Sequence, residues 1–249
     1  MPKTHDVAVE DRGKGATMSM NGSRLLNCCA RVVRAALPQD CLLCGAASDD
    51  APLCEPCQDE LPVLPRACPV CAMPSSLGEI CGTCLRRPPQ FDMTVAAWRY
   101  AYPVDRLVQA LKFHGRLALA SFFADVLAPR VQRADMVIPM PLHPSRLTER
   151  GFNQAAEIAR HLAGRLGTVF AFQCASRIRR TLPQADLPLG ERSRNVRGAF
   201  ACAFDLTGAR VAVVDDVMTT GATLGELAMV LKRAGAARVE NWVVARTLD

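Results

Sequence analysis

The sequence has no long apolar run, and this absence argues against a membrane-spanning helix, which needs about 20 apolar residues. The one-sided apolar stretch 25–37 is interrupted by Arg31 and Arg34, so it does not resemble a signal peptide. We therefore expect a cytoplasmic protein without membrane insertion. Aromatic residues make up only 5% of the chain, so the core should consist mainly of Leu, Val and Ala. A G-K-[ST] motif is also missing, which argues against a Walker A loop.

The excess of one charge sign is small. The 249 residues include 30 Lys and Arg against 24 Asp and Glu, which gives a formal net charge of +6. This balance suits anionic ligands or nucleic acid but requires neither, and a solvated basic surface explains it as well. The length suffices for one α/β domain with a smaller module.

Cysteine, in contrast, is abundant: eight of its 12 residues form four C-x-x-C pairs, and nine residues separate the two pairs of each half. In a reducing cytosol this spacing predicts metal binding rather than disulfides, because two such pairs complete a closed tetrahedral shell around structural Zn²⁺. We expect two zinc sites. Their ligands are Cys41, Cys44, Cys54 and Cys57 in the first half, and Cys68, Cys71, Cys81 and Cys84 in the second.

Gly45 and Gly82 suit the tight turns in which backbone N–H groups point at sulfur. The cysteine block has little core of its own, so metal binding would supply its folding free energy. Three alternatives stay open: one zinc site beside a degenerate half, a redox role for the C-x-x-C pairs, and an interleaved pairing of the same ligands.

Changes in composition divide the chain into four parts. Residues 1–22 are polar and expected to be disordered, residues 23–40 favour an amphipathic helix, and residues 41–86 form the cysteine block. Residues 91–249 alternate strand and helix patterns, which predicts an α/β fold with a parallel sheet flanked by helices. Strands are expected at 93–102, 136–140, 169–174, 198–204, 211–214 and 238–245. Helices are expected at 104–113, 117–131, 153–166 and 224–234, and residues 178–197 are expected to be irregular.

The most informative segment begins with the apolar strand 211–214, which two acids, Asp215 and Asp216, follow. A helix then opens with free N–H groups and a positive dipole end that suit a phosphate. The acids suit ribose hydroxyls or an Mg²⁺ shared with a pyrophosphate. The residues expected to hold a phosphorylated ribose are Asp215, Asp216, Thr219, Thr220, Gly221, Ala222 and Thr223.

The sequence V-V-D-D-V-M-T-T-G-A-T at 213–223 resembles the phosphoribosyl pyrophosphate (PRPP) loop of type I phosphoribosyltransferases. Within that group the chain resembles the ComF family, which includes ComFC and GntX-like proteins, over residues 25–249. The double cysteine block also matches, and so do three further stretches: 111–116 (LKFHGR), 137–154 (from VIPMPLHP to RGFNQ), and 180–200 with its Arg-Thr and Glu-Arg pairs.

This resemblance implies a type I phosphoribosyltransferase-like domain that binds PRPP with Mg²⁺, preceded by a double zinc ribbon. It places the pyrophosphate side at Ser145, Arg146 and Arg150. It also implies a loop that closes over PRPP near 177–197, where Arg180 or Arg192 is a candidate to stabilise the departing pyrophosphate. The resemblance also implies a hood, which is the separate segment with which type I enzymes recognise the acceptor base. Only residues 246–249 follow the last expected strand, so we expect a hood to come from residues 91–130 or from the zinc block, or to be lacking.

Two functional hypotheses follow. The first is a phosphoribosyltransferase of unknown acceptor. The second is a non-catalytic protein that binds nucleic acid or senses PRPP, because resemblance to ComF implies a role with single-stranded DNA during natural transformation or in the use of DNA as a nutrient. DNA-uptake or recombination proteins would then be partners.

Overall fold

The computed structural model describes residues 39–48, 51–181 and 188–248. The expected tail 1–22 and the expected amphipathic helix up to residue 38 lie outside the described residues. Residues 39 and 40, the end of that expected helix, form strand β1 (Gln39–Asp40). Within the described ranges no helix combines the length and apolarity needed to cross a bilayer.

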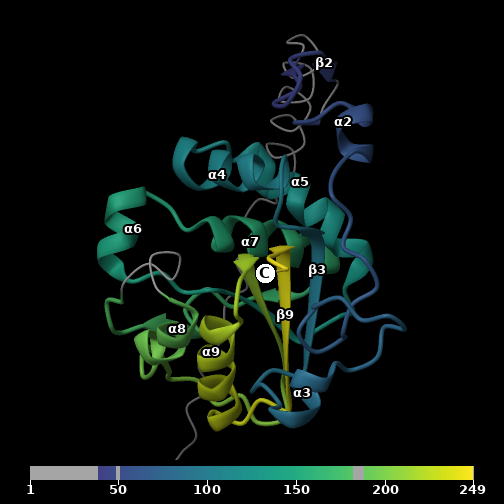
Figure 1. Ribbon diagram of the computed structural model, residues 1–249. Coiled ribbons are helices and arrows are strands. Elements are labelled where there is room, and N and C mark those ends of the chain that lie inside the picture. The colour runs from purple at the N-terminus through teal and green to yellow at the C-terminus, as the bar shows by residue number, and fades with distance from the viewer. Residues whose placement is uncertain (1–38, 49–50, 182–187, 249) are drawn as a thin grey trace, which may run out of the picture.

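A five-stranded parallel sheet forms the centre of the fold (Figure 1), with the order β3-β9-β8-β4-β5. Its strands are β3 (Met93–Arg99), β4 (Met136–Pro139), β5 (Val169–Phe170), β8 (Arg210–Met218) and β9 (Arg238–Arg246). The register pairs Met136 with Val211 and Arg210 with Arg238. β9 is buried along almost its whole length, as expected for a parallel strand covered on both faces.

Helices cover both faces of this sheet. The first face carries α4 (Val104–His114), α5 (Ala118–Leu127) and α7 (Gln154–Leu166), which pack with Ala212 and Val214 of β8. The second face carries α9 (Ala222–Arg233) and the antiparallel pair β6 (Ala175–Arg177) and β7 (Phe200–Cys202), which pack with Val211 and Val213. Successive side chains of β8 thus face opposite cores, as expected for a β-strand, in which the side-chain direction repeats every two residues.

The remaining elements are short. They are β2 (Ala47–Ser48), α2 (Glu55–Asp59), α3 (Gly82–Arg86), the 3-10 turn η1 (Ala128–Arg130), α6 (Pro144–Arg150) and α8 (Leu189–Val196). In Figure 1, α2 and β2 lie at the top of the view, and α3 lies at the bottom beside the start of β3. The two halves of the cysteine block therefore contact different parts of the α/β domain.

Three expectations about the elements were wrong. The strand expected at 211–214 extends to Met218, because β9 pairs with it through Arg246, so both acids belong to the strand. The strand expected at 169–174 covers only two residues. Residues 178–197, expected to be irregular, contain helix α8. The side chain of Arg179 stabilises the end of this helix by donating to the carbonyls of Asn195 and Arg197.

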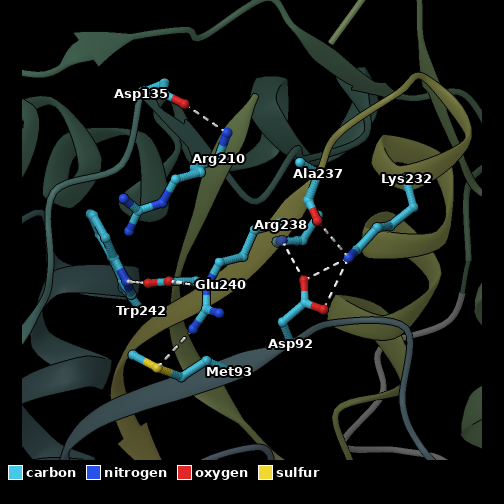
Figure 2. A network of polar contacts seen from close by, with 10 residues as sticks. Asp92, Met93, Asp135, Arg210, Lys232, Ala237, Arg238, Glu240 and Trp242 are labelled. Atoms are coloured by element: carbon cyan, nitrogen blue, oxygen red, sulfur yellow. Dashed lines mark hydrogen bonds and ion pairs between the residues drawn. The ribbon is translucent and has the colours of Figure 1, made fainter. Parts of the chain in front are cut away.

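A polar network fixes the amino-terminal ends of the central strands (Figure 2). Asp92 accepts from the backbone N–H of Val239 at 2.7 Å and pairs with Lys232 of α9 at 2.7 Å. Glu240 is buried and accepts from Arg238 at 2.6 Å and from the indole of Trp242 at 3.2 Å. These contacts lie at the end of the sheet opposite Asp215 and Asp216, so one end is fixed and the carboxyl end carries the pocket.

Candidate functional site

A pocket of about 540 Å³ lies at the carboxyl ends of β4 and β8. This is the edge at which open α/β sheets bind ligands. Six of the seven residues expected to hold a phosphorylated ribose line it: Asp215, Asp216, Thr219, Gly221, Ala222 and Thr223. Thr220 is not among the lining residues, and its hydroxyl instead accepts a hydrogen bond from the N–H of Ala222 at 3.3 Å.

The turn between β8 and α9 depends on Gly221. This residue has φ +79° and precedes the first residue of α9. A Cβ at this position would lie 2.7 Å from Cε of Met218, which is itself buried. The turn therefore needs glycine for its conformation and for its space, and it brings the N-terminus of α9 to the pocket.

The two acids have different surroundings. Asp216 is buried, pairs with Lys112 of α4 at 3.6 Å, and accepts from the amide of Gln154 at 3.3 Å. Asp215 is half-buried in the pocket wall. Burial, together with the adjacent charge of Asp216, raises the pKa of Asp215 well above its ordinary value. Such a pair suits a cation or a ribose hydroxyl and disfavours a phosphate at the same point.

Four cationic side chains line the pocket beside these two acids: Lys112, Arg146, Arg150 and Arg177. Burial lowers the pKa of Arg150 and of Arg177, since each guanidinium is partly withdrawn from water. Arg146 donates to the carbonyl of Thr181 at 3.3 Å, and Arg150 donates to Gln154 at 3.4 Å. With two more cations than acids, the pocket suits a multiply charged anion.

Arg177 stands out among these cations. Its guanidinium bonds to the hydroxyl of Thr181 and lies over the ring of Phe200 at 5.4 Å. Within the described part of the chain its buried Nε has no hydrogen-bond partner. A buried donor without a partner costs free energy, which an anionic ligand in the pocket would recover.

The structure divides the expected pyrophosphate side. Arg146 and Arg150 line the pocket, whereas Ser145 lies in the first turn of α6, where its hydroxyl bonds to Nδ1 of the capping His143 at 2.9 Å. Arg180 is exposed and pairs with Glu149 at 3.3 Å. Neither Arg180 nor Arg192 of α8 is among the lining residues. Their candidate role in catalysis stays a prediction.

From the sequence, Lys112 is only a weak candidate for an anion contact, and neither Gln154 nor Arg177 is singled out. Arg177 carried a signal, as part of the basic stretch 177–197, but six arginines there could not be ranked by sequence alone. Tyr100, Val108, Gln109 and Phe113 also line the pocket. They fall within residues 91–130, one of the ranges expected for a hood.

Each half of the cysteine block brings its own four sulfur atoms together, and within each group all lie within 4.8 Å of one another. The Sγ atoms of Cys44 and Cys54 are 3.6 Å apart, and those of Cys71 and Cys81 are 3.7 Å apart. A tetrahedron with zinc–sulfur bonds of about 2.3 Å has edges of about 3.8 Å, so both groups fit Zn²⁺. The neighbouring pairing is observed, and the interleaved alternative is wrong.

Backbone donors surround the sulfurs. Burial acts to raise the pKa of Cys41, but hydrogen bonds from the backbone N–H groups of Cys44, Cys54 and Leu43 outweigh it. The pKa of Cys41 is lowered to about 6 as a result. Burial also acts to raise the pKa of Cys68. Hydrogen bonds from the backbone N–H groups of Cys81, Cys71 and Val70 outweigh this effect and lower the pKa to about 7. Gly45 has φ +72° as its turn requires, but Gly82 begins α3, and the left-handed position of the second half belongs to Ala72 at φ 57°.

Comparisons with known proteins agree with this architecture. Residues 32–85 match the family described as a double zinc ribbon domain. The chain is 34% identical to DNA utilization protein YhgH of Salmonella typhimurium over 206 residues, covering 79% of this chain and 91% of that protein. It is 30% identical to competence protein F of Haemophilus influenzae over 207 residues, covering 78% and 90%.

Among solved structures, the chain is similar to a purine phosphoribosyltransferase from Pyrococcus horikoshii, with a TM-score of 0.30 and 19% identity, over 63% of this chain and 89% of that chain. The expected parallel sheet flanked by helices, with two cysteine clusters before it, is confirmed.

Proposed function

This chain belongs to the family of DNA utilization protein YhgH and competence protein F, and we propose that it binds PRPP with Mg²⁺ in the pocket at the end of β8. One observation carries the proposal. The paired acids Asp215 and Asp216, the N-terminus of α9 and four cations line the same pocket of about 540 Å³. Few ligands other than a ribose with several phosphates need all three kinds of group at once.

Each part of PRPP has a counterpart in this pocket. Thr219, Gly221 and Thr223 line the pocket at the start of α9 and would hold the 5′-phosphate, because the positive end of a helix dipole favours an anion. Asp215 and Asp216 would hold the ribose hydroxyls and an Mg²⁺ ion, whose preferred ligands are oxygen atoms. Arg146, Arg150 and Arg177 would hold the pyrophosphate.

We infer that the reaction is phosphoribosyl transfer to an acceptor that the pocket alone does not name. A nucleophile forms a bond to C1′ of the ribose, and the bond from C1′ to the pyrophosphate oxygen breaks, with its electron pair leaving on pyrophosphate. The protein would contribute position and charge. The arginines would stabilise the leaving group, and the lining residues Tyr100, Gln109 and Phe113 would contact the acceptor.

Calorimetric titration of PRPP with Mg²⁺ tests the binding step. We expect the wild type to bind, and Asp216→Asn to bind at least about tenfold more weakly, because a charge-assisted contact is lost. Asp125→Asn is the matched control, since Asp125 lies on α5 in an exposed pair with Arg165. Equal affinity in wild type and Asp216→Asn, or no binding in either, would refute the proposal.

A second candidate function is a role with single-stranded DNA, as a binding protein that uses or senses PRPP without transfer. Six arginines between residues 177 and 197 favour it, against Asp186 and Glu191. The relatives' names, DNA utilization and competence, concern those proteins, and we extend a link with DNA uptake or use to this chain as a proposal. DNA-uptake or recombination proteins would be its partners, and the cytoplasm its location.

Fluorescence anisotropy with a labelled single-stranded oligonucleotide separates the two candidates. DNA binding through arginines should weaken steeply as salt rises. A flat response, or no binding at low salt, rejects the second candidate. Release of pyrophosphate from PRPP in a screen of bases, nucleosides and oligonucleotides supports transfer, and binding without release supports sensing.

A further inference from the structure

The side chain of Arg246 lies buried at the end of β9, between the second cysteine tetrad and the loop 219–221, which joins β8 to α9. Its Nε donates to the carbonyl of Cys71 at 2.9 Å. Its Nη1 donates to the carbonyl of Met218 at 3.1 Å and also to that of Thr219. One guanidinium therefore joins a zinc-ligand residue to the two residues that open the turn of the loop.

The second half of the cysteine block is attached to the domain beside this link. Thr94 of β3 donates its backbone N–H to the carbonyl of Pro69 at 2.9 Å. Val70 and Cys71 pack against the core that contains Phe91 and Met218. Phe91 also lies next to Gly221, within 3.6 Å of a Cβ built there. A shift of the Cys68–Cys71 turn would thus reach the loop through hydrogen bonds and through packing.

The charge of Arg246 needs compensation. The residue is buried, with 5% of its surface exposed, and among the described residues no carboxylate lies at ion-pair distance from its guanidinium. Zn²⁺ with four thiolates carries two net negative charges, and the guanidinium contacts this tetrad directly through the carbonyl of Cys71 at 2.9 Å. A filled second tetrad is therefore the counter-charge that makes a buried arginine tolerable.

The first tetrad has a different environment. The hydrogen bonds of Cys41 and Cys44 join residues of the same half, to Ala46, Gly45 and Cys54. Cys41 packs in the other core, with Leu53, Leu61 and Trp98. The chain therefore contains a matched control, because two tetrads of the same ligands differ in their contact with the loop.

We propose that Arg246 is a positioning residue that couples metal in the second tetrad to the shape of the loop 219–221. Zinc in this tetrad, and not in the first, then sets the affinity for the phosphoribosyl ligand. This inference rests on the proposed PRPP site for its functional consequence, but the coupling itself is a property of the chain without ligand.

The experiment uses the full zinc-loaded chain and the variants Cys71→Ser, Cys41→Ser and Arg246→Met. Hydrogen exchange at the amides of 219–222 is followed without ligand, and PRPP with Mg²⁺ is titrated by calorimetry. Zinc content is measured for each variant. Arg246→Lys, which keeps the charge but loses the planar fork, is included as the conservative change.

We expect Cys71→Ser to speed exchange at 219–222 and to weaken PRPP binding at least about tenfold, while Cys41→Ser leaves both unchanged. Arg246→Met should loosen the loop equally while zinc in the first tetrad stays bound, and Arg246→Lys should recover part of the affinity. A purely structural role would instead lower the unfolding temperature without a selective effect on these amides.

Equal exchange at 219–222 in Cys71→Ser and Cys41→Ser would overturn the coupling. So would an unchanged loop in a folded Arg246→Met, and this variant decides the matter if Cys71→Ser does not fold. If the wild type does not bind PRPP at all, the proposed function fails, but the exchange measurement still decides whether the second tetrad controls the loop.

Discussion

Asp215 and Asp216 are adjacent carboxylates on a strand of the central sheet, an arrangement that opposes folding. Asp216 has partners in Lys112 and Gln154. Asp215 accepts from the backbone N–H of Asp216 at 2.9 Å. The raised pKa of Asp215 follows from burial first and from the charge of Asp216 second. We interpret this unfavourable pair as a cost that the site accepts in order to hold a cation or ribose.

Replacing Asp215 by asparagine should therefore stabilise the protein without ligand. The pKa of Asp215 is well above its ordinary value in the folded state, whereas in the unfolded chain it is near 3.8. The stability contributed by this group then falls as pH rises from the unfolded pKa to the folded pKa. Asparagine stays neutral, so we expect a gain on the order of 1 kcal/mol at pH 7.5 in Mg²⁺-free buffer.

Urea unfolding at pH 7.5 and at pH 3.5 measures this difference. The gain should shrink toward zero at pH 3.5, because Asp215 is protonated there in the folded state and largely so in the unfolded chain. Binding of PRPP with Mg²⁺ should be weaker in the same variant. A variant less stable than wild type at pH 7.5 would contradict our interpretation of the pair.

At the scale of elements, the β6–β7 pair and helix α8 determine which arginines of the basic stretch reach the pocket. Arg177 ends β6 and lines the pocket, where it lies over Phe200 of β7. Arg179 bonds to the last turn of α8, and Arg180 pairs with Glu149 of α6 at the surface. Three arginines within four residues thus have three different roles.

This division predicts distinct effects of three alanine variants on PRPP binding. Arg177→Ala should weaken binding about tenfold to a hundredfold, because a partly buried guanidinium with a free donor is lost. Arg180→Ala should change the affinity less than about twofold, since its exposed pair contributes little. Arg179→Ala should lower stability with little effect on affinity. A larger loss of affinity in Arg180→Ala than in Arg177→Ala would contradict the assignment.

The parts of the candidate site that are local in the chain could be predicted from the sequence. The strand, the acids, the glycine turn and the helix start are consecutive, so their chemistry could be predicted from residues 211–224 alone. Both cysteine tetrads could be predicted for the same reason. Lys112, Gln154 and Arg177 come from α4, α7 and β6, and only the packing of those elements brings them to the acids.

The extent of β8 shows a second limit. Its end at Met218 depends on pairing with β9, which is a contact between distant segments. The local pattern changes from apolar to acidic at Asp215, so an end at Val214 was the natural inference. Helix α8 was missed because its stretch is polar and arginine-rich, and its last turn is held by Arg179 from outside the helix.

At the scale of the whole molecule, the cysteine block does not form an independent unit. Cys41, Leu53 and Leu61 belong to the same core as Trp98 and helices α4, α5 and α7. Val63 bridges to Trp98, and Val70 packs against the other core. The folding free energy that metal supplies to this block should therefore contribute to the stability of the α/β domain as well.

We accordingly expect two zinc ions per purified chain, and a fall in the unfolding temperature on the order of 5 °C or more when a chelator removes them. The two tryptophans report on the cause, because Trp98 lies against the first half of the block whereas Trp242 is fully buried in the sheet. In Trp242→Phe the fluorescence of Trp98 should shift to the red on chelation. In Trp98→Phe the fluorescence of Trp242 should stay unchanged while the sheet remains folded. Near-zero zinc with reactive thiols would instead favour a redox role for the cysteines, and equal shifts in both variants would mean that metal loss unfolds the whole chain.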